Sequence, residues 1–280
     1  MPARSLDEIE SINPAVVQKA RDAFILTDFD ARISGFDLGG LAPGFPWHIE
    51  EKSIISARDK RVSVGSSGLD ALLGGGLGCG YITDFYGSRS TGKSHLCFQL
   101  ALNNSTSGNN SLFIDTLGSF RPERIMQMAK ARKLDPANLL QRIFVMRCLT
   151  LNQQLDVPGK VVEFLKKDRA NLLIIDDISS NFLPAKVDTT NIGVRSLFAR
   201  HIHEISHLAM EKTLSIAITN GVRARPSVEG SKEVREAFSQ FTSEAISERI
   251  KLEGRSRFIV AIRADGRMNN FTITESGVSD

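Results

Sequence analysis

Short apolar runs alternate with longer amphipathic segments through the middle of the chain. The apolar runs lie at 81–87, 111–116, 142–147, 171–177 and 214–220. Segments with a helical pattern lie between them, at 93–103, 122–132, 157–169 and 194–211. Strands that alternate with helices and are apolar almost throughout are typical of a parallel sheet that helices cover on both faces. The pattern therefore predicts an α/β fold with a mainly parallel central sheet.

The pattern changes toward both ends of the chain. After residue 246 the runs ERIKL, RFIVAIR and NNFTIT predict shorter strands, linked by hairpins, that add an antiparallel extension to the sheet. Residues 6–21 have a helical pattern, whereas 34–47 are rich in glycine and proline and are typical of a linker. We therefore expect a short helical N-terminal segment and linker over residues 1–60, and a core domain over 61–280.

The composition indicates a soluble protein without a secretion or membrane signal. The chain has 280 residues, of which 24% are charged and 41% hydrophobic, an ordinary globular mixture. Its formal net charge is only +3, so a nucleic-acid-binding surface would have to be local. The three cysteines are far apart, which argues against zinc binding or disulfides and for reduced thiols. No apolar run is long enough to cross a membrane, so we expect a cytoplasmic protein.

Residues 87–94 carry the strongest chemical signal in the sequence. They read GSRSTGKS, match the phosphate-loop pattern GxxxxGK[ST], and lie between a predicted strand and a predicted helix. In such a loop the backbone N–H groups surround a phosphate, and the helix N-terminus adds its dipole. Lys93 is expected to reach the β- and γ-phosphates of a nucleotide, and Ser94 to bind Mg²⁺. The predicted nucleotide contacts are Gly87, Ser88, Arg89, Ser90, Thr91, Gly92, Lys93 and Ser94.

Two consecutive carboxylates follow the apolar run LLII at 172–175. Downstream of a phosphate loop, an acid at the end of such a strand holds Mg²⁺ through water, and we assign this role to Asp176. An ordinary strand-end aspartate is the alternative. Asp177 has two open interpretations: it polarises a water as a possible base, or it is a solvated loop residue or a helix cap. The predicted catalytic set is therefore Lys93, Asp176 and, as the possible base, Asp177.

Several longer stretches resemble one protein family. They are VGSSGLDALLGGGLGCGYITDFYG at 64–87, STGKSHLCFQLAL at 90–102, FIDTLGSFRPERI at 113–125 and FARHIHEISHLAMEKTLSIAITN at 198–220. Together they resemble the RecA/RadA recombination ATPases, in particular the archaeal and eukaryotic branch, over roughly residues 61–280. The resemblance implies a RecA-like P-loop ATPase core, ATP and Mg²⁺ as cofactors, and a RadA paralogue that acts in DNA recombination and repair.

Two positions depart from the family pattern at the reaction centre. The family places a glutamate, which orients the attacking water, where this chain has Leu117 in FIDTLGSFRPER. A leucine side chain cannot accept a proton or bond to water, and loss of a positioned base slows such reactions by about 10²–10⁴-fold. After ITN at 218–220 the family has a glutamine that senses the γ-phosphate, whereas this chain has Gly221. We therefore expect ATP binding with weak hydrolysis.

The resemblance also implies two DNA-binding loops, after the strands that end at Asp176 and Asn220. The corresponding segments, 186–195 and 221–230, carry basic residues that can neutralise phosphates along a single strand of DNA. The expected DNA contacts are Lys186 and Arg195 in the first segment, and Arg223 and Arg225 in the second. A solvated basic surface without DNA contact is the alternative.

Other family features are altered or reduced. Arg124 matches an arginine that packs against the adenine ring, with a solvated helix arginine as the alternative. The N-terminal part resembles only the tail of the family's helix-hairpin-helix domain. The Phe-x-x-Ala motif that docks neighbouring subunits has its nearest counterpart in IISA at 54–57, and the ATP-cap region at 263–270 lacks proline. Self-association is therefore expected to use, at most, a degenerate filament motif.

These inferences favour an ATP-binding RadA-type paralogue that acts as an accessory or regulator in recombination and repair. We expect it to bind single-stranded DNA, the main RadA-type recombinase, or both, and to hydrolyse ATP weakly. Two alternatives stay open. One is an active DNA-dependent ATPase that uses Asp177 as its base, and the other is a non-enzymatic adaptor with a degenerate ATPase fold.

Overall fold

The computed structural model describes residues 6, 13–22, 60–183, 192–226, 232–246 and 248–280. The chain divides into two compact units, Met1–Ser53 and Ile54–Asp280. The described part of the first unit consists mainly of helix α1 (Pro14–Asp22). The predicted linker at 34–47 and the IISA motif at 54–57 lie outside the described residues.

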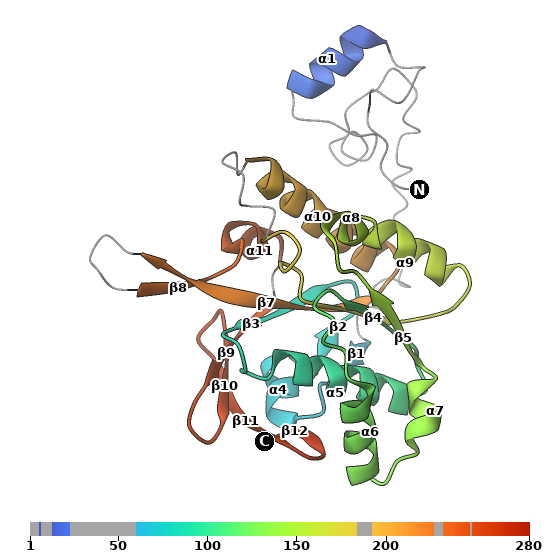
Figure 1. Ribbon diagram of the computed structural model, residues 1–280, viewed down its shortest axis with the longest axis vertical. Helices are drawn as coiled ribbons and strands as arrows, with labels where there is room; N and C mark the ends of the chain where they lie inside the picture. Colours follow the sequence, from blue (N-terminus) through green and yellow to red (C-terminus); the bar gives the residue numbers. More distant parts are fainter. Residues whose placement is uncertain (1–5, 7–12, 23–59, 184–191, 227–231, 247) are drawn as a thin grey trace. The chain divides into compact units, whose positions relative to one another are not determined.

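In the described residues of the second unit, ten strands form the central sheet (Figure 1). Their order is β12-β11-β10-β9-β3-β7-β6-β4-β5, and β8 pairs with β7 beside this path. The strands are β3 (Ile82–Gly87), β4 (Ser111–Asp115), β5 (Ile143–Arg147), β6 (Leu172–Asp176), β7 (Ser215–Pro226), β8 (Lys232–Glu236), β9 (Glu248–Gly254), β10 (Ile259–Arg263), β11 (Met268–Thr274) and β12 (Gly277–Ser279). All pairs from β9 to β5 are parallel, whereas β9 to β12 pair with one another antiparallel. The predicted parallel sheet with an antiparallel C-terminal extension is confirmed.

Helices cover both faces of this sheet. The described helices are α4 (Ser67–Leu72), α5 (Lys93–Thr106), α6 (Pro122–Ala131), α7 (Pro136–Leu140), α8 (Leu151–Leu155), α9 (Val157–Leu165), α10 (Ile192–Glu211) and α11 (Ser239–Ala245). Figure 1 shows α4, α5 and α6 on one side of the sheet and α8, α9 and α10 on the other. A separate two-stranded ribbon, β1 (Arg61–Val62) and β2 (Leu77–Gly78), precedes β3. Among the helices described, none combines the length and the apolar character that a membrane crossing requires.

The buried side chains form one apolar layer on each face of the sheet. On the side of α5, Phe85 of β3 and Phe113 of β4 share a layer with Leu96 of that helix. On the side of α10, Ile82 of β3 shares a second layer with Ile202. Successive residues of a strand point to opposite faces, and here both faces are buried. This is why the strands are apolar at almost every position instead of alternating with polar residues.

The second predicted DNA segment, 221–230, differs from the expected loop. Strand β7 continues into this segment and pairs with β8 as an antiparallel hairpin. The register places Arg225 opposite Glu233. Arg223 and Arg225 therefore lie on a β-hairpin, and the prediction of a loop is wrong for the part of the segment within β7.

A buried glutamine joins three distant parts of the core. Gln99 of α5 is fully buried, and its amide nitrogen donates hydrogen bonds to the Val64 and Val278 carbonyls at 2.8 and 3.1 Å. Its side-chain oxygen accepts from the Val278 amide at 2.6 Å and from the Arg132 guanidinium at 2.7 Å. This one side chain therefore satisfies polar groups of the segment before α4, of the end of α6 and of the last strand.

Replacing Gln99 by methionine keeps the approximate volume of the side chain but removes these hydrogen bonds. The Val278 amide and the Arg132 guanidinium then lose a partner, so we expect the free energy of unfolding to fall by roughly 2–4 kcal/mol. Chemical denaturation followed by circular dichroism measures this change. The control is Gln141→Met at an exposed position, which should change stability by less than about 0.5 kcal/mol. Equal effects of the two substitutions would contradict the role assigned to Gln99.

Candidate nucleotide-binding site

The phosphate loop connects the carboxyl end of β3 to the N-terminus of α5. A Cβ on Gly87 would collide with the Leu252 carbonyl oxygen of the neighbouring strand. Gly92 is the N-cap of α5 with a φ of 84°, a left-handed conformation that favours glycine. Thr91 closes the turn between them, because its Oγ1 donates a hydrogen bond to the Ser88 carbonyl at 2.9 Å. The loop therefore has a tight backbone curve that requires glycine at both ends.

Lys93 is the cation of this loop. Its Nζ donates hydrogen bonds to the carbonyl oxygens of Gly87 and Ser88 at 2.8 and 2.7 Å. Burial lowers the pKa of Lys93, and the nearby Asp177 and Asp176 carboxylates partly offset that change. A half-buried ammonium group that bonds to carbonyls of its own loop can exchange them for phosphate oxygens, which are stronger acceptors. The loop and its lysine therefore fit the triphosphate of a nucleotide.

Ser94, in the first turn of α5, faces the buried carboxylate at the end of β6. Its hydroxyl donates a hydrogen bond to Asp176, and Thr219 Oγ1 donates another. Burial raises the pKa of Asp176, and these hydrogen bonds partly offset the change. Mg²⁺ prefers such oxygen ligands and usually completes its shell with waters and nucleotide phosphates. Ser94 and Asp176 provide two oxygen ligands that fit an ion which nucleotide phosphates also bind. Among the residues that the structure describes, no group of three His, Cys, Asp or Glu could hold a metal ion together.

The turn after β4 presents Leu117 to solvent. The Asp115 carboxylate accepts hydrogen bonds from the Ser119 and Phe120 amides at 2.9 and 3.2 Å, which closes the turn. Leu117, within this turn, is 55% exposed. Asp115 lies opposite Asp176 in the sheet, so the turn begins at the same edge at which Asp176 ends its strand. The aliphatic side chain at this edge has no group that could hold a water.

Asp177 is buried next to Asp176 and is held by its own turn. Its Oδ1 accepts hydrogen bonds from the Ser179 amide and hydroxyl at 2.6 and 2.8 Å. Burial raises the pKa of Asp177 to about 6. A Cβ on Gly221 would lie 3.7 Å from Asp177 Oδ2, so the glycine leaves open the space on that side of the carboxylate. Asp177 is therefore a buried acid near Lys93, and the interpretation as a solvated loop residue is wrong.

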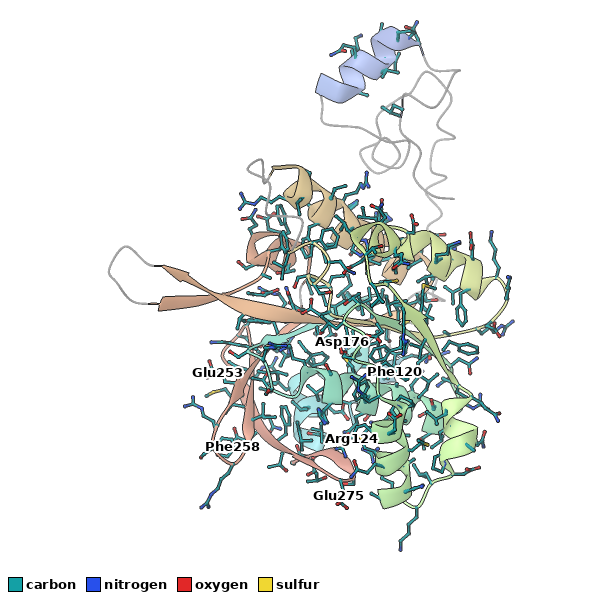
Figure 2. The ribbon with its side chains drawn as sticks, viewed as in Figure 1. Phe120, Arg124, Asp176, Glu253, Phe258 and Glu275 are labelled. Atoms are coloured by element: carbon teal, nitrogen blue, oxygen red, sulfur yellow. The ribbon has the colours of Figure 1, made fainter. Side chains whose placement is uncertain are left out.

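An open hollow of about 530 Å³ lies beside the start of α5. Its lining residues are His95, Arg124, Gln127, Ile273, Thr274 and Glu275. The Arg124 guanidinium donates to the Glu275 carbonyl at 3.2 Å, to Gln127 at 2.6 Å and to the Thr274 carbonyl. Figure 2 shows Arg124 and Glu275 close together at this edge of the fold. Because His95 directly follows the phosphate loop, the hollow is suitably placed for the base of a nucleotide bound there.

Three of the four predicted DNA contacts lie on described elements. Lys186 lies outside the described residues. Arg195 lies in the first turn of α10, and its guanidinium donates to Gln240 of α11 at 2.8 Å. Arg223 and Arg225 are two positions apart on β7. Since α10 begins within the first DNA segment and α11 follows β8, the Arg195 contact connects the first segment to the helix after the second.

A buried ion pair lies beneath the site at positions that no sequence motif marks. Asp84 of β3 is fully buried, and its Oδ2 lies 3.6 Å from Arg249 Nε of β9. The two residues are partners in the parallel register of these strands. Burial raises the pKa of Asp84 to about 7, and the Arg249 guanidinium partly offsets that change. The one signal for this pair in the sequence is an aspartate inside the apolar run YITDFYG.

The substitution Asp84→Asn tests this pair through the pH dependence of stability. A carboxyl whose pKa is raised on folding stabilises the fold below its unfolded value of 3.8, and this contribution is lost as the pH rises through about 7. Relative to Asp84→Asn, the wild type should therefore lose up to roughly 4 kcal/mol of unfolding free energy between pH 4 and pH 8. Urea denaturation at a series of pH values measures the difference. A difference that does not vary with pH would show that Asp84 titrates normally.

Comparison with known proteins places the chain in a family. A family model described as Rad51 matches residues 57–245, which is more than half of the chain. The DNA repair and recombination protein RadA of Aeropyrum pernix is 31% identical over 234 residues, covering 80% of this chain and 72% of that protein. The protein of the same description from Metallosphaera sedula is 29% identical over 251 residues, covering 80% of this chain and 77% of its own. The chain therefore belongs to the Rad51 family, in the RecA/RadA group of proteins.

Proposed function

We propose that this protein is a RadA-type paralogue that binds ATP with Mg²⁺ and acts in DNA recombination and repair as an accessory or regulator. One observation carries the proposal. A complete phosphate loop and a hydrogen-bonded Ser94–Asp176 pair lie at the same sheet edge as a turn that presents Leu117 in place of an acid. The RadA proteins that the chain resembles support the cellular process.

In this proposal the phosphate loop binds the triphosphate, and Lys93 exchanges its carbonyl contacts for phosphate oxygens. Ser94 and Asp176 hold Mg²⁺, which when bound neutralises phosphate charge. Arg124 packs against the adenine ring in the hollow beside α5, because a planar guanidinium suits stacking. The side chains of the site thus supply binding and orientation.

Hydrolysis should be slow because the turn after β4 has Leu117, and not an acid that orients a water, at its exposed position. The loss of a positioned base corresponds to a factor of about 10²–10⁴, or roughly 3–5 kcal/mol of activation free energy. Gly221 adds a second deficit, since it has no side chain to contact the γ-phosphate. The presence of bound ATP, more than its hydrolysis, then sets the state of the protein.

A second candidate function is an active DNA-dependent ATPase in which Asp177 is the base. The raised pKa of about 6 favours it, because a general base works best with a pKa near the operating pH. Ser179 already engages Oδ1, which leaves Oδ2, beside Gly221, as the atom that would accept the proton. A non-enzymatic adaptor differs from both candidates because it would bind partner proteins and no DNA.

Single-stranded DNA is the first proposed partner. Its binding surface would comprise the start of α10 and the β7–β8 hairpin, whose basic residues can pair with phosphates along a strand. The residues assigned to it are Lys186, Arg195, Arg223 and Arg225. A RadA-type recombinase is the second proposed partner, and the family relationship alone supports it.

The substitution Leu117→Glu should place an acid at the exposed position of the turn after β4. We expect turnover with single-stranded DNA to rise at least about tenfold, because a positioned base contributes 10²–10⁴-fold when its geometry is complete. ATP affinity should stay within about twofold, since the phosphate loop is untouched. Phosphate release gives the turnover, and calorimetry gives the affinity.

The matched control is Leu117→Met, which is close to the glutamate in size but neither accepts a proton nor orients a water, and it should leave turnover at the wild-type level. Lys93→Ala should abolish ATP binding with or without the Leu117 substitution. A wild type with vigorous DNA-stimulated turnover, lost in Asp177→Ala while ATP affinity is kept, would contradict slow hydrolysis and establish the second candidate.

The double substitution Arg223→Ala with Arg225→Ala tests the DNA surface. It should reduce the slope of log affinity against log salt by about 1.4, because each phosphate contact on a single strand contributes about 0.7. Fluorescence anisotropy of a labelled oligonucleotide over a salt series measures the slope. The control, Lys166→Ala with Lys167→Ala just past α9, removes the same charge elsewhere and should keep the slope. An unchanged slope in the hairpin variant rules out these contacts, and a wild type without DNA binding favours the adaptor.

A further inference from the structure

A cluster of polar side chains is buried where the β7–β8 hairpin joins the sheet. Its members are Asp84 of β3, Asn220 of β7, Glu236 of β8, Thr242 of α11 and Arg249 of β9. All except Arg249 are buried, and the Arg249 side chain is only 15% exposed. We call this set the hairpin-anchor cluster. Each member comes from a different element, so the cluster joins β3, β7, β8, β9 and α11.

Glu236 is the centre of the hairpin-anchor cluster. Its Oε1 accepts hydrogen bonds from Asn220 Nδ2 at 2.6 Å and from Thr242 Oγ1 at 2.7 Å. Its Oε2 forms an ion pair with Arg249 Nη2. One carboxylate at the end of β8 therefore ties both strands of the hairpin to α11 and to β9.

Arg249 extends these contacts to the strand that carries the phosphate loop. Its Nε lies 3.6 Å from Asp84 Oδ2, and its guanidinium carbon lies 4.9 Å from the centroid of the Tyr86 ring. Tyr86 directly precedes Gly87, the first residue of the phosphate loop. A guanidinium suits this position because it can serve two carboxylates and stack on an aromatic ring. One side chain thus contacts both the base of the hairpin and the strand segment that enters the phosphate loop.

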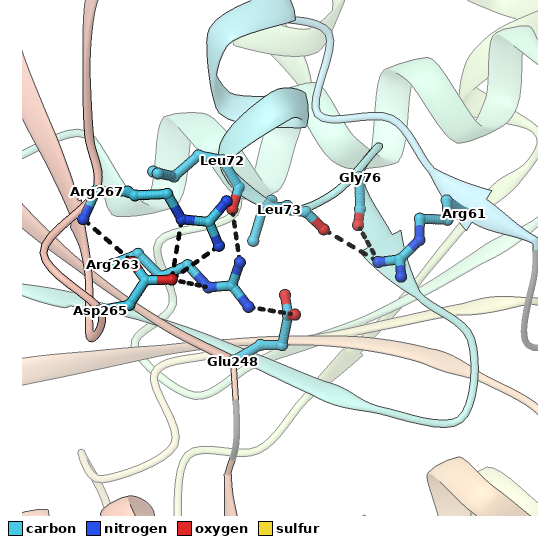
Figure 3. A network of polar contacts seen from close by, with 8 residues as sticks. All are labelled: Arg61, Leu72, Leu73, Gly76, Glu248, Arg263, Asp265 and Arg267. Carbon is cyan, nitrogen blue, oxygen red and sulfur yellow. Dashed lines mark hydrogen bonds and ion pairs between the residues drawn. The ribbon is translucent and has the colours of Figure 1, made fainter.

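A second polar network fixes the strand from which Arg249 extends (Figure 3). Glu248, its neighbour in β9, pairs with Arg263 of β10 at 3.3 Å. Arg263 also donates to the carbonyl of the last residue of α4 at 3.2 Å, and Asp265 joins it to Arg267 (Figure 3). These contacts attach the beginning of β9 to β10 and to α4.

We propose that Arg249 is a positioning residue that couples ATP binding in the phosphate loop to DNA binding on the β7–β8 hairpin. The inference rests on the proposed function, because it requires both ligands. A shift of β3 on nucleotide binding changes the contacts of Asp84 and Tyr86 with Arg249, and Arg249 transmits the change to Glu236. β7 also pairs directly with β3 up to Gly87 and Gly221, so the contacts of Arg249 act beside the backbone pairing of the sheet.

The test measures single-stranded DNA affinity with and without ATP and Mg²⁺, and ATP affinity with and without DNA. Anisotropy of a labelled oligonucleotide gives the ratio of DNA affinities with and without ATP, and calorimetry gives the ratio of ATP affinities with and without DNA. Thermodynamic linkage requires these two coupling ratios to agree. The wild type should show a ratio of about fivefold or more. Arg249→Met keeps the aliphatic part of the side chain and removes the guanidinium. It should bring the ratio to about 1 while each ligand still binds alone.

Lys251→Met is the matched control. Lys251 lies two residues along β9, on the same face as Arg249, and its ammonium group pairs with Glu253. The substitution removes the same charge and should keep the wild-type ratio. Glu236→Gln keeps the size of the side chain and should also bring the affinity ratio to about 1. It provides a second variant if Arg249→Met unfolds. Thermal unfolding of each variant separates loss of fold from loss of coupling.

The outcomes separate this inference from the proposed function. Loss of the ratio in Arg249→Met and Glu236→Gln, with Lys251→Met unchanged, supports the coupling role. A wild type that binds both ligands with a ratio near 1, or an Arg249→Met protein that keeps the wild-type ratio, overturns the inference and leaves the proposed function standing. A wild type that binds no ATP or no DNA contradicts the proposed function, and the inference then fails with it.

Discussion

The parallel register of the central sheet is the constraint on which the rest of the site depends. Because β3, β4, β6 and β7 run in the same direction, their carboxyl ends meet at one edge. The register places Gly87 beside Gly221 and Asp115 beside Asp176, although these residues are far apart in the sequence. The residues at and just after the strand ends then determine which chemical groups the edge presents to a ligand. Leu117 is exposed in the turn after β4, and hydrogen bonds to Asp115 close that turn.

Burial disfavours the charged forms of the ionisable side chains at this edge. Desolvation lowers the pKa of Lys93 and raises the pKa of Asp84, Asp176 and Asp177, in each case against the charged form. A ligand that brings opposite charges relieves this penalty. Phosphates provide them for Lys93, and a metal ion provides them for Asp176. The site has Leu117 where an acid is expected, but its buried charged groups still favour the binding of ATP with Mg²⁺.

The core elements could be predicted because both faces of a parallel sheet are buried, so its strands are apolar almost throughout. The phosphate loop could be predicted because its glycine spacing reflects backbone geometry. The β7–β8 hairpin could not, since Arg223 and Arg225 alternate with small residues in a pattern that a loop and an exposed hairpin share. The contact of Asp84 with Arg249 depends on the register of two strands distant in sequence, which no local pattern encodes. The roles of Leu117 and Asp177 in hydrolysis stay predictions.

The central claim is that this protein holds ATP and hydrolyses it slowly. The most direct measurement is a single-turnover assay, in which excess protein, Mg²⁺ and single-stranded DNA are mixed with a trace of labelled ATP. Bound ATP and product ADP are then followed together over time. ATP should be bound within the mixing phase and remain intact long after binding is complete. Conversion of the bound ATP to ADP as fast as it binds would contradict slow hydrolysis.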